Sequence, residues 1–449
     1  MRNLPLSLSL LLLFGPGALL SAQKVWWVDA SRGGANNPGT YSKPFKSIST
    51  GVSALNNGDT LFIMPGLYSP TRTGEKFPIP VVKPRVRIIG VGGASMVVLD
   101  GEGKAPMMLK FQSSATGSGV FGIHFRNGRR KHAGWYDGAV YVDGNTPGIE
   151  VAGCFFSLLE RGIQVRSWNK TPLGKPRIHD NLLVDLDNDA ICMWGASGTF
   201  CYNNTIYKNQ NLGVMVAGDA VRCTILNNLA VLCREGINVD NDPAKTPISL
   251  VECNDAWGNT TNYAGRYGAS SKLPKSNISV DPLFVAPSKG DFRLKANSPL
   301  IGKGWMKDLS LFRTPDFYLG ARVFDFNGDG AALVDVGCHE VSDVLTTQTG
   351  TWVPGGTIVI GHKAPASYVV AVDLFGRDVP GLTLPGLGTF LLDPARLLPF
   401  GFVGPGNGSV KLAIPNDPNL SGGIRIYFQA IYVHPKGMVK AGNLLLGIL

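Results

Sequence analysis

Apolar and polar residues alternate in five short segments near the middle of the chain, and each segment opens with a small residue. The first position expected to be buried recurs at intervals of 23, 28, 23 and 23 residues, at Val140, Ile163, Ile191, Val214 and Ile237. The second such position keeps the same intervals, at Val142, Val165, Met193, Val216 and Val239. Because the side chains of a strand alternate between its two faces, the pattern predicts five stacked strands that share one apolar face.

Asparagine recurs in a second series of apolar segments that lies between the first five. Asn181, Asn204, Asn228 and Asn254 take equivalent places, and Cys154 takes that place one coil earlier. Asparagine tolerates left-handed backbone and its amide can bond to the next coil, so we expect a repeated tight bend with a ladder of stacked amides. A period near 23 residues with two strands and no helix predicts one turn of a parallel β-helix.

Two further segments carry motifs of their own. Residues 25–68 read VWWVDASRGGANNPGTYSKPFKSISTGVSALNNGDTLFIMPGLY, and residues 279–304 read SVDPLFVAPSKGDFRLKANSPLIGKG, with VDVGCHE at 334–340. Together with the repeat, they resemble the right-handed β-helix superfamily that contains pectate, alginate and chondroitin lyases. The resemblance implies an entry module with a short helix around residues 47–56, and final coils formed by the later motifs. It is informative about the fold, whereas the same module occurs in enzymes and in other surface proteins.

The chain divides into three expected parts. Residues 1–22 have a basic start, an apolar run and a break at 15–17, which is typical of a secretory signal peptide, and the run is too short to span a bilayer. Residues 23–343 form the right-handed parallel β-helix. Residues 344–449 are rich in Gly, Pro and Leu with alternating strands, which predicts a small β-sandwich that resembles modules following extracellular bacterial β-helices. We therefore expect an all-β protein, secreted or at the cell surface, with no transmembrane segment.

Composition and charge narrow the possible partners. The 44% hydrophobic and 16% charged content supports a large core, and the 57 glycines and 30 prolines favour a turn-rich all-β chain. The net charge of +10 favours an acidic polysaccharide, another cell-surface glycan or an anionic surface over nucleic acid, since no nucleic-acid module is visible. An effect on solubility alone is the alternative. For the seven cysteines, disulfides and buried thiols both stay open.

One coil is five residues longer than its neighbours, and its extra residues follow Arg166. Cations beside aromatic rings are what a groove for uronic acids needs, and long turns of repeat proteins gather on binding faces. A solvated loop without function is the alternative. We expect Lys170 to be the catalytic base and Arg166 to neutralise the substrate carboxylate, with substrate contacts from Trp168, Lys175, Asp189, Trp194, Glu235 and Asp240.

β-Elimination of a uronate-containing glycan is the preferred reaction if the protein is catalytic. No motif of a known lyase family is visible, so no catalytic residue can be transferred. Hydrolysis by Asp185, Asp187 and Asp189 is an alternative, although the Gly-His-Gly element of β-helix polygalacturonases is absent. Epimerisation is another, and a non-catalytic surface or adhesion scaffold is the rival from a different class.

Two further segments carry charged side chains suited to binding. Residues 325–330 read DFNGDG, the oxygen alternation of a calcium loop, so we expect Ca²⁺ as a possible cofactor held by Asp325, Asn327 and Asp329. Position 12 of that loop is Val336 rather than an acid, so a plain turn is the alternative. The basic run 126–132 is the other candidate, as a contact for an acidic polymer.

Overall fold

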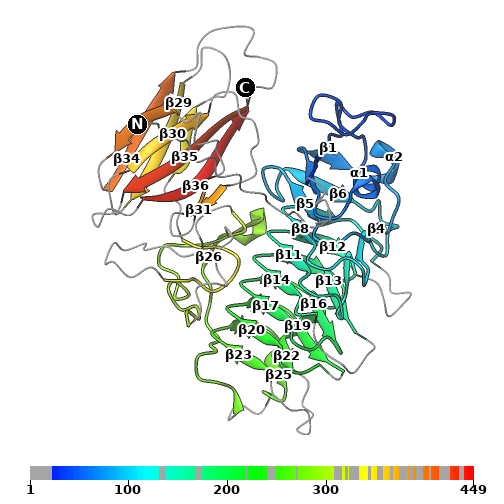
Figure 1. The fold of residues 1–449 in the computed structure, drawn as a ribbon. Coiled ribbons are helices and arrows are strands. Elements are labelled where there is room, and N and C mark those ends of the chain that lie inside the picture. The colour runs from blue at the N-terminus through cyan, green and yellow to red at the C-terminus, as the bar shows by residue number, and fades with distance from the viewer. Residues whose placement is uncertain are drawn as a thin grey trace, which may run out of the picture.

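Parallel strands from successive coils form three long sheets, as the computed structural model shows (Figure 1). The structure describes residues 23–130, 138–167, 174–218, 220–239, 249–268, 272–307, 316–318, 322 and 333–341, together with the backbone of the strands between 345 and 448. Each coil contributes one strand to each sheet in turn, which is the arrangement of a β-helix.

We name the three sheets A, B and C in the order in which a coil enters them. Sheet A contains β1 (Val25–Val28), β2 (Thr60–Ile63), β5 (Arg87–Gly90), β8 (Gly119–Phe121), β11 (Glu150–Ala152), β14 (Arg177–His179), β17 (Phe200–Tyr202), β20 (Thr224–Leu226) and β23 (Leu250–Glu252). Sheet B contains β3 (Gly66–Tyr68), β6 (Val97–Asp100), β9 (His124–Arg126), β12 (Phe155–Leu159), β15 (Leu182–Leu186), β18 (Thr205–Tyr207), β21 (Leu229–Val231) and β24 (Asp255–Trp257). Sheet C contains β4 (Ile79–Val81), β7 (Leu109–Phe111), β10 (Val140–Asp143), β13 (Ile163–Arg166), β16 (Ile191–Trp194), β19 (Leu212–Ala217), β22 (Glu235–Val239) and β25 (Thr261–Gly265).

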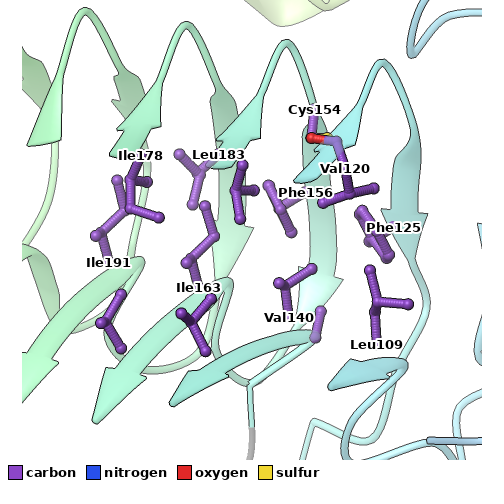
Figure 2. Packing of buried hydrophobic residues seen from close by; sticks show 14 of the residues in the cluster. Leu109, Val120, Phe125, Val140, Cys154, Phe156, Ile163, Ile178, Leu183 and Ile191 are labelled. Carbon is purple, nitrogen blue, oxygen red and sulfur yellow. The ribbon is translucent and has the colours of Figure 1, made fainter. Parts of the chain in front are cut away.

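The register of sheet C confirms the predicted repeat. Val140 pairs with Ile163, and the following strands continue the row through the predicted residues to Ile237. The same pairs carry the second buried row from Val142 to Val239. Figure 2 shows side chains of the three sheets pointing into one core, whose members are fully or almost fully buried.

A ladder of five asparagine side chains links the coils at the bend between sheets A and B. The Nδ2 atom of Asn181 donates to Oδ1 of Asn204 at 2.9 Å, and the chain of bonds continues in the same sense through Asn228 and Asn254 to Asn277. The amide ladder is confirmed and is one rung longer than predicted. The left-handed residue is the one before Asn181, Asn204, Asn228 and Asn254, as at Asn203 (φ 52°), so the prediction that the ladder residues take that conformation is wrong.

All seven cysteines are free thiols. Six are buried and Cys253 is partly exposed, and burial raises the pKa of Cys154 to about 12. The six buried cysteines therefore act as small apolar core residues, and the open alternative of disulfides is excluded.

A short helix covers the first coil, as the entry motif implies. Helix α1 (Ile48–Ala54) begins after Ser47, whose side chain accepts from the amide of Thr50. The carboxylate of Glu75, just after helix α2 (Pro70–Thr73), accepts from the amides of Ile48 and Ser49 at 2.8 and 2.9 Å. Orphan amides of the α1 N-terminus are thus satisfied by side chains.

The motifs at 279–304 and 334–340 do not form further coils, so that expectation is wrong. Strands β26 (Phe284–Ala286) and β27 (Asp291–Leu294) pair with each other antiparallel, joined by the 3-10 turn η2 (Pro287–Lys289). Phe284, Phe292 and Leu294 pack with outward residues of sheet B such as Leu229. We call the described residues between 280 and 341 the return segment, because its strands β26 and β27 pack outside the solenoid instead of extending it.

Antiparallel strands follow the return segment. They form three sheets built from β28 (Leu345–Gly350), β29 (Thr357–Ala364), β30 (Tyr368–Asp373), β31 (Leu382–Leu384), β32 (Gly388–Phe390), β33 (Leu398–Val403), β34 (Gly406–Ala413), β35 (Arg425–Val433) and β36 (Val439–Ile448). The predicted fold class, a parallel β-helix followed by a smaller antiparallel β unit, is confirmed. The boundaries after residues 22 and 343 stay predictions. No helix among the described residues is long and apolar enough to cross a membrane.

The ladder gives a test of what holds the coils in register. Asn204 is fully buried, and its amide bonds to Asn181, Asn228 and the carbonyl of Ile178. We expect Asn204→Ala to lower the free energy of unfolding by about 2–4 kcal/mol, because it leaves buried donors and acceptors unpaired. Urea denaturation measures this. Asn277→Ala, at the last rung, is the control and should cost less; equal losses would contradict the ladder as a cooperative element.

Candidate functional site

The outer face of sheet C brings together several of the predicted site residues. Lys110 Nζ lies 5.6 Å from the ring centre of Tyr141 in the next coil. The guanidinium of Arg166 lies 5.5 Å from the ring of Trp194, again one coil further on. Parallel register therefore produces two cation–ring pairs on the predicted face.

This face is not the open groove that the sequence predicts. Several outward side chains are almost wholly buried, with exposed fractions of 8% for Tyr141, 2% for Gln164, 3% for Cys192 and 5% for Arg166. Asp143, Trp194 and Met215 are only partly exposed. Direct access for a polymer is therefore limited to the coils around Trp194.

Asp189 belongs to a row of polar residues that precedes the strands of sheet C. Its carboxylate lies 3.5 Å from Arg161 Nε and accepts from Asn211 at 3.0 Å, and burial raises the pKa of Asp189. Glu235 follows in a later coil, where it lies 3.3 Å from Arg234 and accepts from Asn238 at 2.5 Å. Both predicted acids flank the face, but each is held by neighbours of its own.

Lys175 is not beside Arg166 and Trp194, so its predicted position is wrong. It lies at the bend before β14 of sheet A, in left-handed conformation (φ 45°) and next to Gly198 of the following coil. The chain has left sheet C by this point, which the length of the insertion alone did not reveal. The remaining predicted site residues lie outside the described residues: Trp168, Lys170, Asp240, Asp325, Asn327 and Asp329.

Arg130 forms ion pairs with two of the three aspartates considered for hydrolysis. Its guanidinium bonds to Asp187 at 3.0 Å and to Asp185 at 3.4 Å, and these bonds raise the pKa of Arg130. Arg126 of the same basic run bonds to Asp100 at 2.8 Å. Arg126 and Arg130 are thus paired within the protein, which weakens both the hydrolase alternative and the polymer contact predicted for this run.

A buried ionic network on sheet A was missed from the sequence. His179 bonds to Glu150 at 2.8 Å and to Asp180 at 2.7 Å, and its ring stacks on Tyr202 at 4.6 Å. Burial alone would lower the pKa of His179, but the bonds to the two carboxylates outweigh it and raise that pKa. Asp180 in turn pairs with Arg322 of the return segment. No motif signalled this network, because Asp180 and Arg322 are 142 residues apart and meet only after folding.

Metal ligands do not gather in the described part of the chain, where no group of three His, Cys, Asp or Glu side chains is placed to hold an ion. A depression of about 420 Å³ lies near Asp100 and Glu102. Its acids are already bonded, Glu102 to the amide of Thr71 at 2.9 Å and Asp100 to Asn127 at 2.9 Å. The depression therefore presents no free ligand set.

Asp255 is a buried carboxyl near the C-terminal end of the solenoid. Its Oδ1 atom accepts from the amide of Val280 at 2.9 Å, and its Oδ2 atom has no hydrogen-bond partner in the described residues. Burial raises the pKa of Asp255 to about 7. A shifted pKa often marks a functional site, but this side chain is fully buried and pairs in register with Leu229.

Residues 31–257, just over half of the chain, match the family described as "Protein of unknown function (DUF1565)". The chain belongs to this family. The family model covers most of the solenoid and stops before the return segment. No curated protein matches the chain.

Several solved structures resemble the protein in part. They include the catalytic domain of a GH87 α-1,3-glucanase in complex with nigerose (14% identity, TM-score 0.40, covering 55% of this chain and 41% of that one). Pectate lyase Pel9A matches at 14% identity with TM-score 0.38, covering 71% of this chain and 97% of that one. A rhamnogalacturonan lyase matches at 14% identity with TM-score 0.33, covering 57% and 65%. The chain thus spans about two fifths of the glucanase and just under two thirds of the rhamnogalacturonan lyase.

Asp255 predicts a pH dependence of stability. The carboxyl has an ordinary pKa near 3.9 when unfolded and about 7 when folded. The folded state therefore binds the proton more tightly, so stability is full below about pH 4 and falls by about 2–4 kcal/mol as the pH rises to about 7. In Asp255→Asn, the thermal midpoint should fall less between pH 5 and pH 8 than in the wild type. Parallel pH profiles for the two proteins would contradict a neutral buried carboxyl.

Proposed function

We propose that this protein binds an acidic polysaccharide outside the cell, on the outer face of sheet C. The observation that carries the proposal is the partly exposed Trp194 with the guanidinium of Arg166 at 5.5 Å from its ring. Lys110 and the buried Tyr141 form a second cation–ring contact in the same face. Sugar rings stack on aromatic faces, and guanidinium and ammonium groups pair with carboxylates. The net charge of +10 adds a long-range attraction for a polyanion.

The partly exposed Trp194 is the proposed contact for a sugar ring. Its indole is backed by Arg166, which is 95% buried and therefore lies in a medium of lower effective dielectric than water. A uronate carboxylate that approached Trp194 would therefore lie close to this guanidinium. Asp189 and Glu235 at the margin of the face are proposed to contact the sugars of the substrate.

We further propose that the bound polysaccharide is cleaved by β-elimination. Lys170 removes the proton on the carbon next to the uronate carboxylate, the electron pair forms the new C=C bond, and the bond to the 4-linked oxygen breaks with that oxygen taking up a proton. Arg166 neutralises the carboxylate, and Trp168 and Asp240 contact the sugars beside the scissile bond. Ca²⁺ bound by Asp325, Asn327 and Asp329 is proposed as a cofactor. The signal peptide at 1–22 would deliver the protein to the cell surface or the medium.

A non-catalytic surface or adhesion scaffold is the second candidate. It is favoured by the burial of Tyr141, Gln164, Cys192 and Arg166, since a catalytic groove has to admit its polymer to the outward side chains. Such a protein would use sheet C for support and bind partners elsewhere.

Binding and cleavage can be tested together on the purified full-length protein. With alginate, polygalacturonate and chondroitin sulfate as probes, we expect retardation in affinity electrophoresis that weakens about tenfold in Trp194→Ala and less in Lys110→Gln. Lys208→Gln is the matched control, because Lys208 lies 5.7 Å over the Tyr207 ring beside sheet B. Binding at sheet C would be contradicted if none of the three polymers retarded the protein. It would also be contradicted if Trp194→Ala, Lys110→Gln and Lys208→Gln all weakened the retardation equally.

Absorbance at about 235 nm, where unsaturated uronates absorb, reports elimination in the same samples. A lyase requires a rise with at least one polymer, and that rise must be lost in Lys170→Ala while binding persists. Binding without any rise in absorbance would exclude lyase activity and support a protein that binds the polysaccharide without cleaving it. A changed uronate composition without chain cleavage would indicate an epimerase instead.

A further inference from the structure

The residue two positions before each strand of sheet A, from β2 to β20, has left-handed backbone in seven successive coils. We call these residues the bend column: Gly58 (φ 84°), Arg85 (57°), Gly117 (69°), Gly148 (67°), Lys175 (45°), Gly198 (73°) and Arg222 (57°). Backbone bonds link neighbouring coils along it, as from the amide of Gly117 to the carbonyl of Pro147 at 2.7 Å. The column is therefore a regular line of positions parallel to the solenoid axis.

Glycine occupies four of these positions, and the other three are all cations. Glycine adopts the left-handed region freely, whereas an L side chain there costs about 1–2 kcal/mol. Arg85, Lys175 and Arg222 are exposed, and none forms an ion pair with a carboxylate of the described residues. The local backbone therefore does not explain why these three positions hold long cationic side chains instead of the glycine found in the other coils.

Two further arginines extend the cationic line onto sheet A. Arg87 and Arg177 lie two residues beyond Arg85 and Lys175, in the first outward row of the sheet. The exposed guanidinium of Arg87 lies 4.5 Å from the ring of the partly exposed Phe121. The combination offers cations next to an accessible aromatic face.

Glu150 is the carboxylate within this row, and it is already paired within the protein. Burial would raise the pKa of Glu150, but the hydrogen bond from His179 outweighs it and lowers that pKa to about 2. Glu150 is thus already bonded to His179, at 2.8 Å. Arg177 also lies 3.7 Å from Glu150, whereas the three cations of the bend column form no ion pair among the described residues.

The spacing of the cations suits an extended polymer. Neighbouring coils are about 4.8 Å apart, so Arg85 and Lys175, three coils apart, are separated by about 14 Å along the axis, and Arg222 lies about 10 Å further on. A line of about 24 Å is too long for a single small anion. It is also too sparse for duplex DNA, which carries one charge per about 1.7 Å of its axis.

We propose that the bend column and the adjoining row of sheet A form a second binding surface for an acidic polysaccharide. Arg85, Lys175 and Arg222 pair with carboxylate or sulfate groups spaced along the chain, and Phe121 supports a sugar ring. The ligand class is shared with the function proposed for sheet C, but no residue is shared. The two faces belong to different sheets, so each can fail without the other.

The bend column itself supplies the test. In Arg85→Gly/Lys175→Gly/Arg222→Gly, every changed position receives the residue that other coils use, so the thermal midpoint should stay the same or rise. Affinity for alginate and polygalacturonate should fall about tenfold at low salt, with a weaker salt dependence. The control is Lys208→Gly/Lys104→Gln/Lys289→Gln, which removes the same charge elsewhere and includes the left-handed Lys208 (φ 54°) of another bend. Its affinity should be unchanged.

The outcomes separate the two surfaces. Loss in the glycine variant alone supports the second surface, and it does so whether or not Trp194→Ala has an effect. Equal loss in both triple variants would mean that net charge alone acts, and would overturn the proposal. A loss of affinity only in Trp194→Ala would also overturn it, and would support binding at sheet C alone. Unchanged binding by both triple variants, or duplex DNA bound as tightly as the glycans through the same three residues, would overturn the assignment as well.

Discussion

The stacking of one coil directly on the next is the constraint on which the rest of this structure depends. A strand in the interior of a parallel sheet has to satisfy its amides and carbonyls on both sides, so a coil that slips by one residue would turn its apolar side chains outward. The asparagine ladder from Asn181 to Asn277 fixes that register from within the core. Each amide bonds to the next coil's side chain and also to backbone, which ties five coils into one cooperative unit.

Strict stacking turns single residues into columns, and the columns give each face its chemistry. The outer face of sheet B carries Leu182, Leu229 and Val231, which are covered by the return segment. The outer face of sheet C carries cation–ring pairs, but several of its side chains are buried. The bend before sheet A carries exposed cations at positions that otherwise hold glycine. One repeat unit thus supports three surfaces of different accessibility.

The return segment is joined to the solenoid by charge as well as by apolar packing. Arg322 is buried and lies between Asp180 of the solenoid and Glu340 at the end of the segment. Glu340 also accepts from the amide of Asp335, whose own carboxylate accepts from the amides of Gly302 and Val341. Buried charges are costly unless they are paired, so this network specifies one docked position for the segment. The VDVGCHE motif therefore has a structural role that does not require another coil.

The sequence by itself determined the repeat. Val140 and Ile163, which the sequence spaces by one repeat, pair in register in sheet C. Asn204 and Asn228, which recur at the same interval, are hydrogen-bonded neighbours in the ladder. Both patterns could be predicted because every coil repeats the same local periodicity. The short helix of the entry module was implied by the family resemblance, and its start is set locally by the Ser47 side chain, which accepts from the amide of Thr50.

Tertiary structure alone decided the features that depend on contacts distant in sequence. The burial of Arg166, the position of Lys175 at a different bend and the pairing of Asp187 with Arg130 follow from how turns of different coils lie against one another. The return segment packs outside because the apolar outer face of sheet B is available to it, a fact that strand alternation cannot state. Periodicity encodes which residues stack, whereas the exposure of each face depends on segments that return to it from far along the chain.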